Sequence, residues 1–155
     1  MNDERPRFKE IVIPALLRHA RATYGRAMTR ALSEAGYDDV PRNGLYLIDG
    51  LALGAGGAPL SRLIAELGVS KQAAGQLVDT LVLRGYLERT ADESDRRKLT
   101  VTLTPRGMAA AAAQAAARAR IDAELLARVG AEDLARTRRT LAVLRDMGRQ
   151  AQQDH

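Results

Sequence analysis

The sequence predicts a mostly α-helical protein with one small β-hairpin. Apolar residues make up 46% of the chain but aromatic residues only 3%, a balance typical of helices that pack through small side chains. Apolar side chains recur at helical spacing along most of the chain. Residues 99–103 instead alternate between apolar and β-branched polar side chains, which is the period of a half-buried strand.

Length and charge narrow the class of protein. The 155 residues have the length of a single domain with one core. A formal net charge of +5 and an isoelectric point of about 10.1 favour a polyanionic partner. The chain has no cysteine, which excludes disulfides, zinc fingers, iron–sulfur clusters and thiol-based oxidant sensing by the chain itself. The apolar stretch 11–17 is short and contains Pro14, unlike a signal peptide or a membrane span, so we expect a cytoplasmic protein without membrane contact.

Two helices are predicted before residue 55. Residues 12–35 show apolar side chains at helical spacing, and Gly36 follows as a natural C-cap. Pro41 is expected to open a second helix that runs into the glycine-rich segment 54–57. This segment lacks the Gly-Lys-Ser/Thr of a phosphate-binding loop, so we predict a flexible linker. The buried stripe of the second helix is expected to comprise Leu45, Ile48, Leu51 and Ala52.

A helix-turn-helix is predicted next. Ser61 is expected to be the N-cap of a short helix, residues 62–67, which ends at Gly68. Ser70 is expected to cap a second helix that ends at Gly85. Two helices joined by a three-residue turn that contains glycine have helix-turn-helix geometry. The apolar stripe of the second helix comprises Ala74, Leu77, Val78, Leu81 and Val82.

The remaining chain predicts a hairpin followed by two helices. Residues 86–103 form the hairpin, with Leu99, Val101 and Leu103 facing the core and a charged tip. Thr104 and Pro105 have the residue types of an N-cap and first turn, so a long helix is expected from residue 105. Gly130 should interrupt it, and a last helix should end near residue 150. One face of the last helix should present Leu134, Leu141, Leu144 and Met147.

The exposed face of the second helix-turn-helix helix has side chains suited to DNA. Gln72 and Gln76 could pair with adenine edges in the major groove, and Lys71 could contact guanine or phosphate. Ser70 at a helix N-terminus, and Ser61 before it, could hold phosphate oxygens. The alternative is an ordinary polar helix face, because helix-turn-helix spacings also occur in proteins that do not bind DNA.

The hairpin tip strengthens the DNA interpretation. Its consecutive cations Arg96, Arg97 and Lys98 could reach into the minor groove, where the negative potential is deep. An acid two residues before an arginine could hold its guanidinium through a bidentate pair. The alternative is a self-paired loop of mixed charge, since the acids Glu88, Asp92, Glu93 and Asp95 surround these cations.

On these residues the chain resembles the MarR family of bacterial winged-helix regulators. The wing signature of that family is matched by Asp92, Asp95, Arg96, Arg97, Leu103, Thr104 and Gly107, and the order of elements fits over nearly the whole chain. The resemblance implies a winged helix-turn-helix domain flanked by N- and C-terminal dimerisation helices, in which Asp95 braces Arg97 and Arg97 enters the minor groove. It also implies a homodimer that binds a pseudo-palindromic operator on double-stranded DNA and usually represses transcription.

The resemblance divides the chain into functional segments. We expect a single MarR-like domain over residues 1–155, with dimerisation helices at about 10–36 and 105–150 and a DNA-binding region at about 41–104. The residues expected to contact DNA are Ser61, Ser70, Lys71, Gln72, Gln76, Asp95, Arg96, Arg97 and Lys98.

The same resemblance implies release of DNA by a small aromatic or phenolic effector. The candidate pocket residues are His19, Tyr24, Arg42 and Tyr46, although a packed histidine is the more common role for His19. We expect no catalytic residue, no metal site and no cofactor. Two histidines and no cysteine support neither a Ser-His-Asp arrangement nor a multi-histidine metal site.

Two further functions fit the sequence. A non-specific architectural DNA-binding protein would use the basic wing without reading bases, and would bind random and selected duplexes alike. A helical adaptor would use the alanine-rich helix for protein partners and would show no salt-dependent DNA binding.

Overall fold

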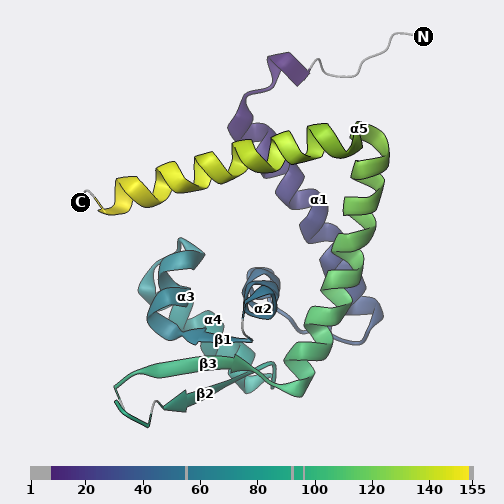
Figure 1. The fold of residues 1–155 in the computed structure, drawn as a ribbon. Coiled ribbons are helices and arrows are strands. Elements are labelled where there is room, and N and C mark those ends of the chain that lie inside the picture. Colours follow the sequence, from purple (N-terminus) through teal and green to yellow (C-terminus); the bar gives the residue numbers. More distant parts are fainter. Residues whose placement is uncertain (1–7, 55, 92, 96, 154–155) are drawn as a thin grey trace. The chain divides into compact units, whose positions relative to one another are not determined.

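The computed structural model describes residues 8–54, 56–91, 93–95 and 97–153. The chain divides into two compact units, one up to Arg118 and one from Ala119 onward. The first unit contains a three-stranded sheet, all the other helices and the first part of the longest helix (Figure 1). The second unit contains the rest of that helix. In chain order the elements are a short 3-10 helix Phe8–Glu10, α1 Ile13–Glu34, α2 Gly44–Leu53, β1 Gly57–Pro59, α3 Leu60–Leu67, α4 Lys71–Leu83, β2 Leu87–Ala91, β3 Leu99–Leu103 and α5 Pro105–Gln153.

The end of α1 agrees with the sequence prediction, whereas the start of α2 does not. Helix α1 ends as expected, because Gly36 adopts a positive φ of 86° and Tyr37 N–H donates to Leu32 O at 2.8 Å. The prediction that Pro41 opens α2 is wrong: its carbonyl accepts from Gly44 N–H in a separate turn, and the helix begins at Gly44. Ala52 is exposed, and the buried residues of α2 are Gly44, Leu45, Leu47, Ile48 and Leu51.

The glycine-rich segment is not a linker throughout. Residues 57–59 form β1, which pairs antiparallel with β3 and gives the sheet order β1-β3-β2. Gly57 lies opposite Thr102, where an added Cβ would come within 2.6 Å of the Thr102 Cγ2. The absence of a side chain at Gly57 therefore allows this edge strand to approach β3.

Helix α3 also begins earlier than predicted. The chain passes directly from β1 into α3 at Leu60, with Pro59 at the N-cap position and no side-chain cap hydrogen bond. Ser61 is consequently in the first turn of the helix and not its N-cap, a correction of the sequence prediction. The C-terminal end agrees with the prediction, because Gly68 is left-handed at φ 65°.

The core of the first unit forms around α2, α4 and the sheet. Ile48, Val78, Leu81, Tyr86 and Val101 have no exposed surface. The first part of α5 attaches to this core through two polar contacts. The fully buried Gln114 donates through Nε2 to Leu45 O at 2.8 Å, and Arg118 forms an ion pair with Asp49.

The second unit comprises the C-terminal part of α5. Its helix is interrupted at Gly130, whose φ of 82° and ψ of 164° are not helical, as the sequence predicted. Apolar side chains remain exposed along it, among them Leu141, Leu144 and Met147. None of the helices in the described part of the chain is both long and apolar enough to cross a membrane.

Candidate nucleic-acid interface

Helices α3 and α4 form the predicted helix-turn-helix. The turn comprises Gly68, Val69 and Ser70, and the Ser70 Oγ accepts a hydrogen bond from Ala73 N–H at 3.1 Å. Ala74, Val78 and Leu81 anchor α4 in the core. This capped and anchored helix presents its other face to solvent from its first turn onward.

That exposed face carries the predicted DNA-contacting side chains. Lys71, Gln72 and Gln76 are exposed, and their side chains form no hydrogen bond or ion pair with another described residue. Ser61 and Ser70 are exposed as well. The Gln amides and the Lys ammonium are therefore available for an external partner with complementary donors and acceptors.

The predicted hairpin consists of β2 and β3, with Leu87 opposite Leu103 and Ala91 opposite Leu99. Val101 is fully buried and Leu103 nearly so, as the alternation predicted. Leu99 is 39% exposed, so the inward-facing pattern does not extend to it. The reason is its position next to the tip, where Leu99 pairs with Ala91 at the outer end of the hairpin.

The hairpin tip has a different internal contact from the one expected. Asp95 Oδ1 accepts from the backbone N–H of Arg97 at 3.0 Å, and Asp95 O accepts from Lys98 N–H at 2.9 Å. Asp95 therefore shapes the loop backbone, and it does not form the expected ion pair with the Arg97 guanidinium. Asp92 and Arg96, which the sequence analysis also singled out, lie outside the described residues.

Among the described residues of the tip, the cations Arg97 and Lys98 are not paired with the neighbouring acids. Arg97 and Lys98 are exposed and form no ion pair with any described residue. Arg89 pairs with Asp79 of α4, and Glu88 accepts from Thr102 Oγ1 at 3.4 Å. Within the described part of the loop, this arrangement favours an anion-binding tip over a self-paired one.

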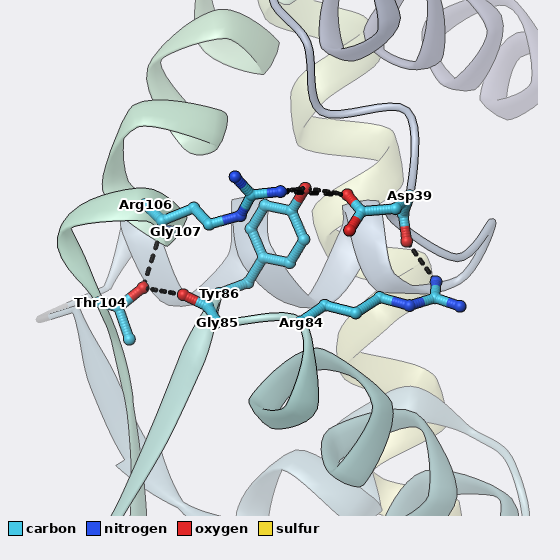
Figure 2. Close-up of polar contacts among 7 residues, drawn as sticks. All are labelled: Asp39, Arg84, Gly85, Tyr86, Thr104, Arg106 and Gly107. Atoms are coloured by element: carbon cyan, nitrogen blue, oxygen red, sulfur yellow. Dashed lines mark hydrogen bonds and ion pairs between the residues drawn. The ribbon is translucent and has the colours of Figure 1, made fainter.

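A polar cluster lies where the hairpin leaves α4 (Figure 2). Tyr86, just before β2, is fully buried, and its hydroxyl donates to Asp39 Oδ1. Arg106 at the start of α5 approaches the Tyr86 hydroxyl at 3.0 Å and Asp39 Oδ1 at 3.3 Å through Nη2. Arg84 at the end of α4 donates to the Asp39 carbonyl. We call Asp39, Arg84, Tyr86 and Arg106 the Tyr86 cluster.

The contacts in this cluster shift two pKa values in opposite directions. The hydrogen bond from Tyr86 lowers the pKa of Asp39 below its usual value of 3.8, with Arg106 and Arg84 adding to the effect against some desolvation. Burial and the Asp39 carboxylate raise the pKa of Tyr86 from 10.0 to about 12. Tyr86 is therefore a neutral donor and Asp39 an anionic acceptor over the whole neutral range.

The start of α5 is fixed to the same point. Thr104 Oγ1 donates to Gly85 O at 2.5 Å and accepts from Gly107 N–H at 3.1 Å, which confirms Thr104 as the N-cap (Figure 2). Thr104 N–H also donates to Tyr86 O at 3.1 Å. Helix α4, the hairpin and α5 thus share one hydrogen-bonded junction.

A cleft of about 830 Å³ lies between α1, α2 and α4. Arg42 and Tyr46, two of the predicted effector residues, line it together with Arg21 and Arg84. The Arg21 guanidinium stacks 4.1 Å from the Tyr46 ring centroid. None of the residues that line this cleft is acidic, so its walls favour an anion.

The other two predicted effector residues do not line this cleft. His19 is exposed on α1, where its carbonyl accepts from Thr23 Oγ1 at 3.1 Å. Tyr24 is partly buried and packs against the core. Sequence reasoning missed Arg21 and Arg84, because each is one of many arginines and only the fold brings them to one cleft. Within the described residues, no three His, Cys, Asp or Glu side chains gather as metal ligands would.

Comparison with known proteins gives a family match. Residues 39–98, which span α2, the helix-turn-helix, β2 and the hairpin tip and end before β3, match the model of the MarR family. A search of curated protein sequences finds no match.

Solved structures share the fold over most of the chain. A probable transcriptional regulator from Pseudomonas aeruginosa is 25% identical with a TM-score of 0.62, over 89% of this chain and 99% of that one. Apo MarR from E. coli is 21% identical with a TM-score of 0.62, over 86% and 96%. MepR from S. aureus in its DNA-binding conformation is 14% identical with a TM-score of 0.73, over 88% and 98%.

Proposed function

We propose that this chain is a transcriptional regulator of the MarR family, the family whose model matches residues 39–98, and that it acts as a homodimeric repressor. In this proposal it binds a pseudo-palindromic operator and is released from it by a small ligand. The family consists of DNA-binding regulators and not of enzymes. One observation carries the proposal. The exposed side chains of Lys71, Gln72 and Gln76 on α4 occur together with those of Arg97 and Lys98 at the hairpin tip, and none of these side chains is paired with another described residue. Both features fit one polyanionic duplex.

The proposed contacts divide by chemistry. Gln72 and Gln76 read base edges in the major groove, since an amide presents a donor and an acceptor side by side. Ser61, Ser70 and Lys71 position the DNA backbone. Arg97 enters the minor groove, and Asp95 accepts a hydrogen bond from its backbone N–H. Arg96 and Lys98 are proposed as further DNA contacts.

Exposed apolar residues support the homodimer. Val12 and Ile13 at the start of α1 are 68% and 63% exposed, and Leu141 and Met147 on the second part of α5 are 41% and 60% exposed. Apolar stripes of this kind are usually covered in an assembly. A dimer through the terminal helices would cover them and would place two winged regions on two half-sites.

The effector is proposed to bind in the cleft lined by Arg21, Arg42, Tyr46 and Arg84. These arginines favour a carboxylate or another anion, and the Tyr46 ring favours a planar group. Gln76 lines the same cleft, so an occupant would directly touch α4, which is the recognition helix in this proposal because it would read the bases. His19 is not part of this proposal, and Tyr24 contributes only through packing.

Selection from a random DNA pool tests the proposal. We expect enrichment of an inverted repeat whose affinity exceeds that of random duplex by roughly 10³ or more. Equal affinity for all duplexes would instead indicate an architectural protein, and absence of salt-dependent binding would indicate an adaptor.

A charge-matched pair of variants tests the wing. Arg97→Ala should weaken operator binding by about 1–3 kcal/mol and reduce the salt slope by roughly one ion. Arg128→Ala removes the same charge from an i,i+4 pair with Glu124 on α5 and should leave operator binding unchanged. Equal behaviour of the two variants would refute the role of Arg97.

A further inference from the structure

The Tyr86 cluster connects three segments that lie far apart in the sequence. Asp39 is in the loop before α2, Tyr86 is at the root of the hairpin, and Arg106 is in the first turn of α5. Figure 2 shows the Tyr86 hydroxyl and the Arg106 guanidinium converging on the Asp39 carboxylate. Arg84, at the end of the recognition helix, holds the backbone of the same aspartate. The cluster therefore surrounds the point from which both α4 and the hairpin project.

The hydroxyl of Tyr86 does more than fill space. A phenylalanine would fill the same buried site and would keep the edge-to-face contact with Tyr37, whose ring centroid is 6.1 Å away. The phenylalanine would lack the hydroxyl that donates a hydrogen bond from the hairpin root to Asp39. The hydroxyl of Tyr37, by contrast, forms no hydrogen bond with a described residue. In this aromatic pair, the Tyr86 hydroxyl is therefore hydrogen-bonded, whereas the Tyr37 hydroxyl has no hydrogen bond with a described residue.

The hairpin amplifies small movements at its root. Strand β2 has five residues, so at about 3.3 Å per residue the tip lies roughly 15 Å from Tyr86. A rotation of about 10° at the root would displace the tip by about 3 Å, which is comparable to a whole hydrogen-bond length. An orientation that keeps Arg97 in contact with DNA therefore has to be fixed at the root.

We propose that Asp39, Tyr86 and Arg106 are positioning residues for DNA binding, which fix the direction of the hairpin relative to the recognition helix so that Arg97 reaches its groove. The proposal rests on the proposed function, because it assumes that the hairpin contacts DNA. It assigns a role in affinity to residues that do not themselves touch DNA.

Matched hydroxyl deletions test this role in the full-length protein. Tyr86→Phe should weaken binding of the selected operator by about tenfold, a part of the loss that removal of a groove contact causes. Tyr37→Phe should bind like the wild type. Asp39→Asn keeps an oxygen that can accept from Tyr86 and should retain more affinity than Asp39→Ala. Hydroxyl-radical footprints should lose protection in the minor groove with Tyr86→Phe and keep methylation protection in the major groove.

A double-mutant cycle separates positioning from general destabilisation. If the Tyr86 hydroxyl acts through Arg97, Tyr86→Phe should have almost no further effect on affinity in the Arg97→Ala background. Additive losses, a uniform weakening of both footprints, or equal affinities of Tyr86→Phe and Tyr37→Phe would each overturn the proposal. A wild-type protein that selects no operator would instead refute the proposed function itself.

Discussion

Substitution of Gly107 by alanine tests whether the junction between the hairpin and α5 is as tight as the structure indicates. Gly107 is in the first turn of α5 directly against the hairpin root. A Cβ at this position would collide with the Tyr86 carbonyl oxygen and would lie 3.0 Å from Leu103 Cδ2 and 3.1 Å from the Tyr86 carbonyl carbon. Two of these three atoms belong to the backbone, so a side-chain rotation cannot relieve the collision.

The expected loss in the free energy of unfolding can be estimated from the shift that the added Cβ forces on α5. The start of α5 would have to shift by roughly 1 Å to restore an ordinary separation. That shift would strain the hydrogen bonds that join Thr104 to Gly85, Tyr86 and Gly107. Each of these hydrogen bonds contributes about 1 kcal/mol to stability. Alanine gains about 1 kcal/mol in helix propensity over glycine. We therefore expect Gly107→Ala to lower the free energy of unfolding by about 1–3 kcal/mol.

Urea denaturation at one fixed protein concentration measures this loss, since the stability of a dimer depends on concentration. The midpoint should fall with an unchanged slope. Gly75→Ala is the matched control, because a Cβ there meets nothing within 4 Å and should stabilise α4 by about 0.5–1 kcal/mol. A Gly107→Ala protein that is as stable as the wild type or the control would refute the reasoning.

Three further predictions concern pH, readout and assembly. Because the pKa of Tyr86 is raised from 10.0 to about 12, the neutral phenol stabilises the fold fully below pH 10 and loses this effect as the pH rises to 12. Between pH 10 and 12, the free energy of unfolding of the wild type should fall by about 2 kcal/mol more than that of Tyr86→Phe. Equal losses for the two proteins would contradict the raised pKa of Tyr86. Gln72→Ala should change the preferred base at particular operator positions, whereas Lys71→Ala should weaken all sequences alike; repeated selection would reject this readout if both variants keep the same consensus. Deletion of residues 131–155 should yield a monomer or an aggregate in light scattering that no longer binds a full operator, and a truncated dimer with normal affinity would exclude the terminal interface.

Local chemistry allowed much of the fold to be predicted from the sequence. Ser70, Gly68 and Thr104 determine helix ends through contacts within a few residues, so their roles follow from residue type and spacing. The interruption at Gly130 and the pairing of β2 with β3 are local in the same sense. The exposed face of α4 follows from the apolar stripe on its opposite side.

Features that depend on distant segments were not predictable in this way. Strand β1 has three residues without alternation, and only its pairing with β3 makes it a strand, which also moves the start of α3 ahead of Ser61. The contact between Asp39 and Arg106 joins residues 67 positions apart. At the hairpin tip, the spacing of Asp95 and Arg97 allows the carboxylate to contact either the guanidinium or the backbone, and the turn selects the backbone.

The most direct test of the account compares the affinity of the wild-type protein for its selected operator with its affinity for a shuffled duplex of the same length and composition. Both titrations are made at one salt concentration near the physiological value, because phosphate contacts alone make affinity depend on salt. A sequence-specific regulator predicts a ratio of roughly 10³ or more in favour of the operator. A ratio close to one, with both duplexes bound, would contradict base readout by α4.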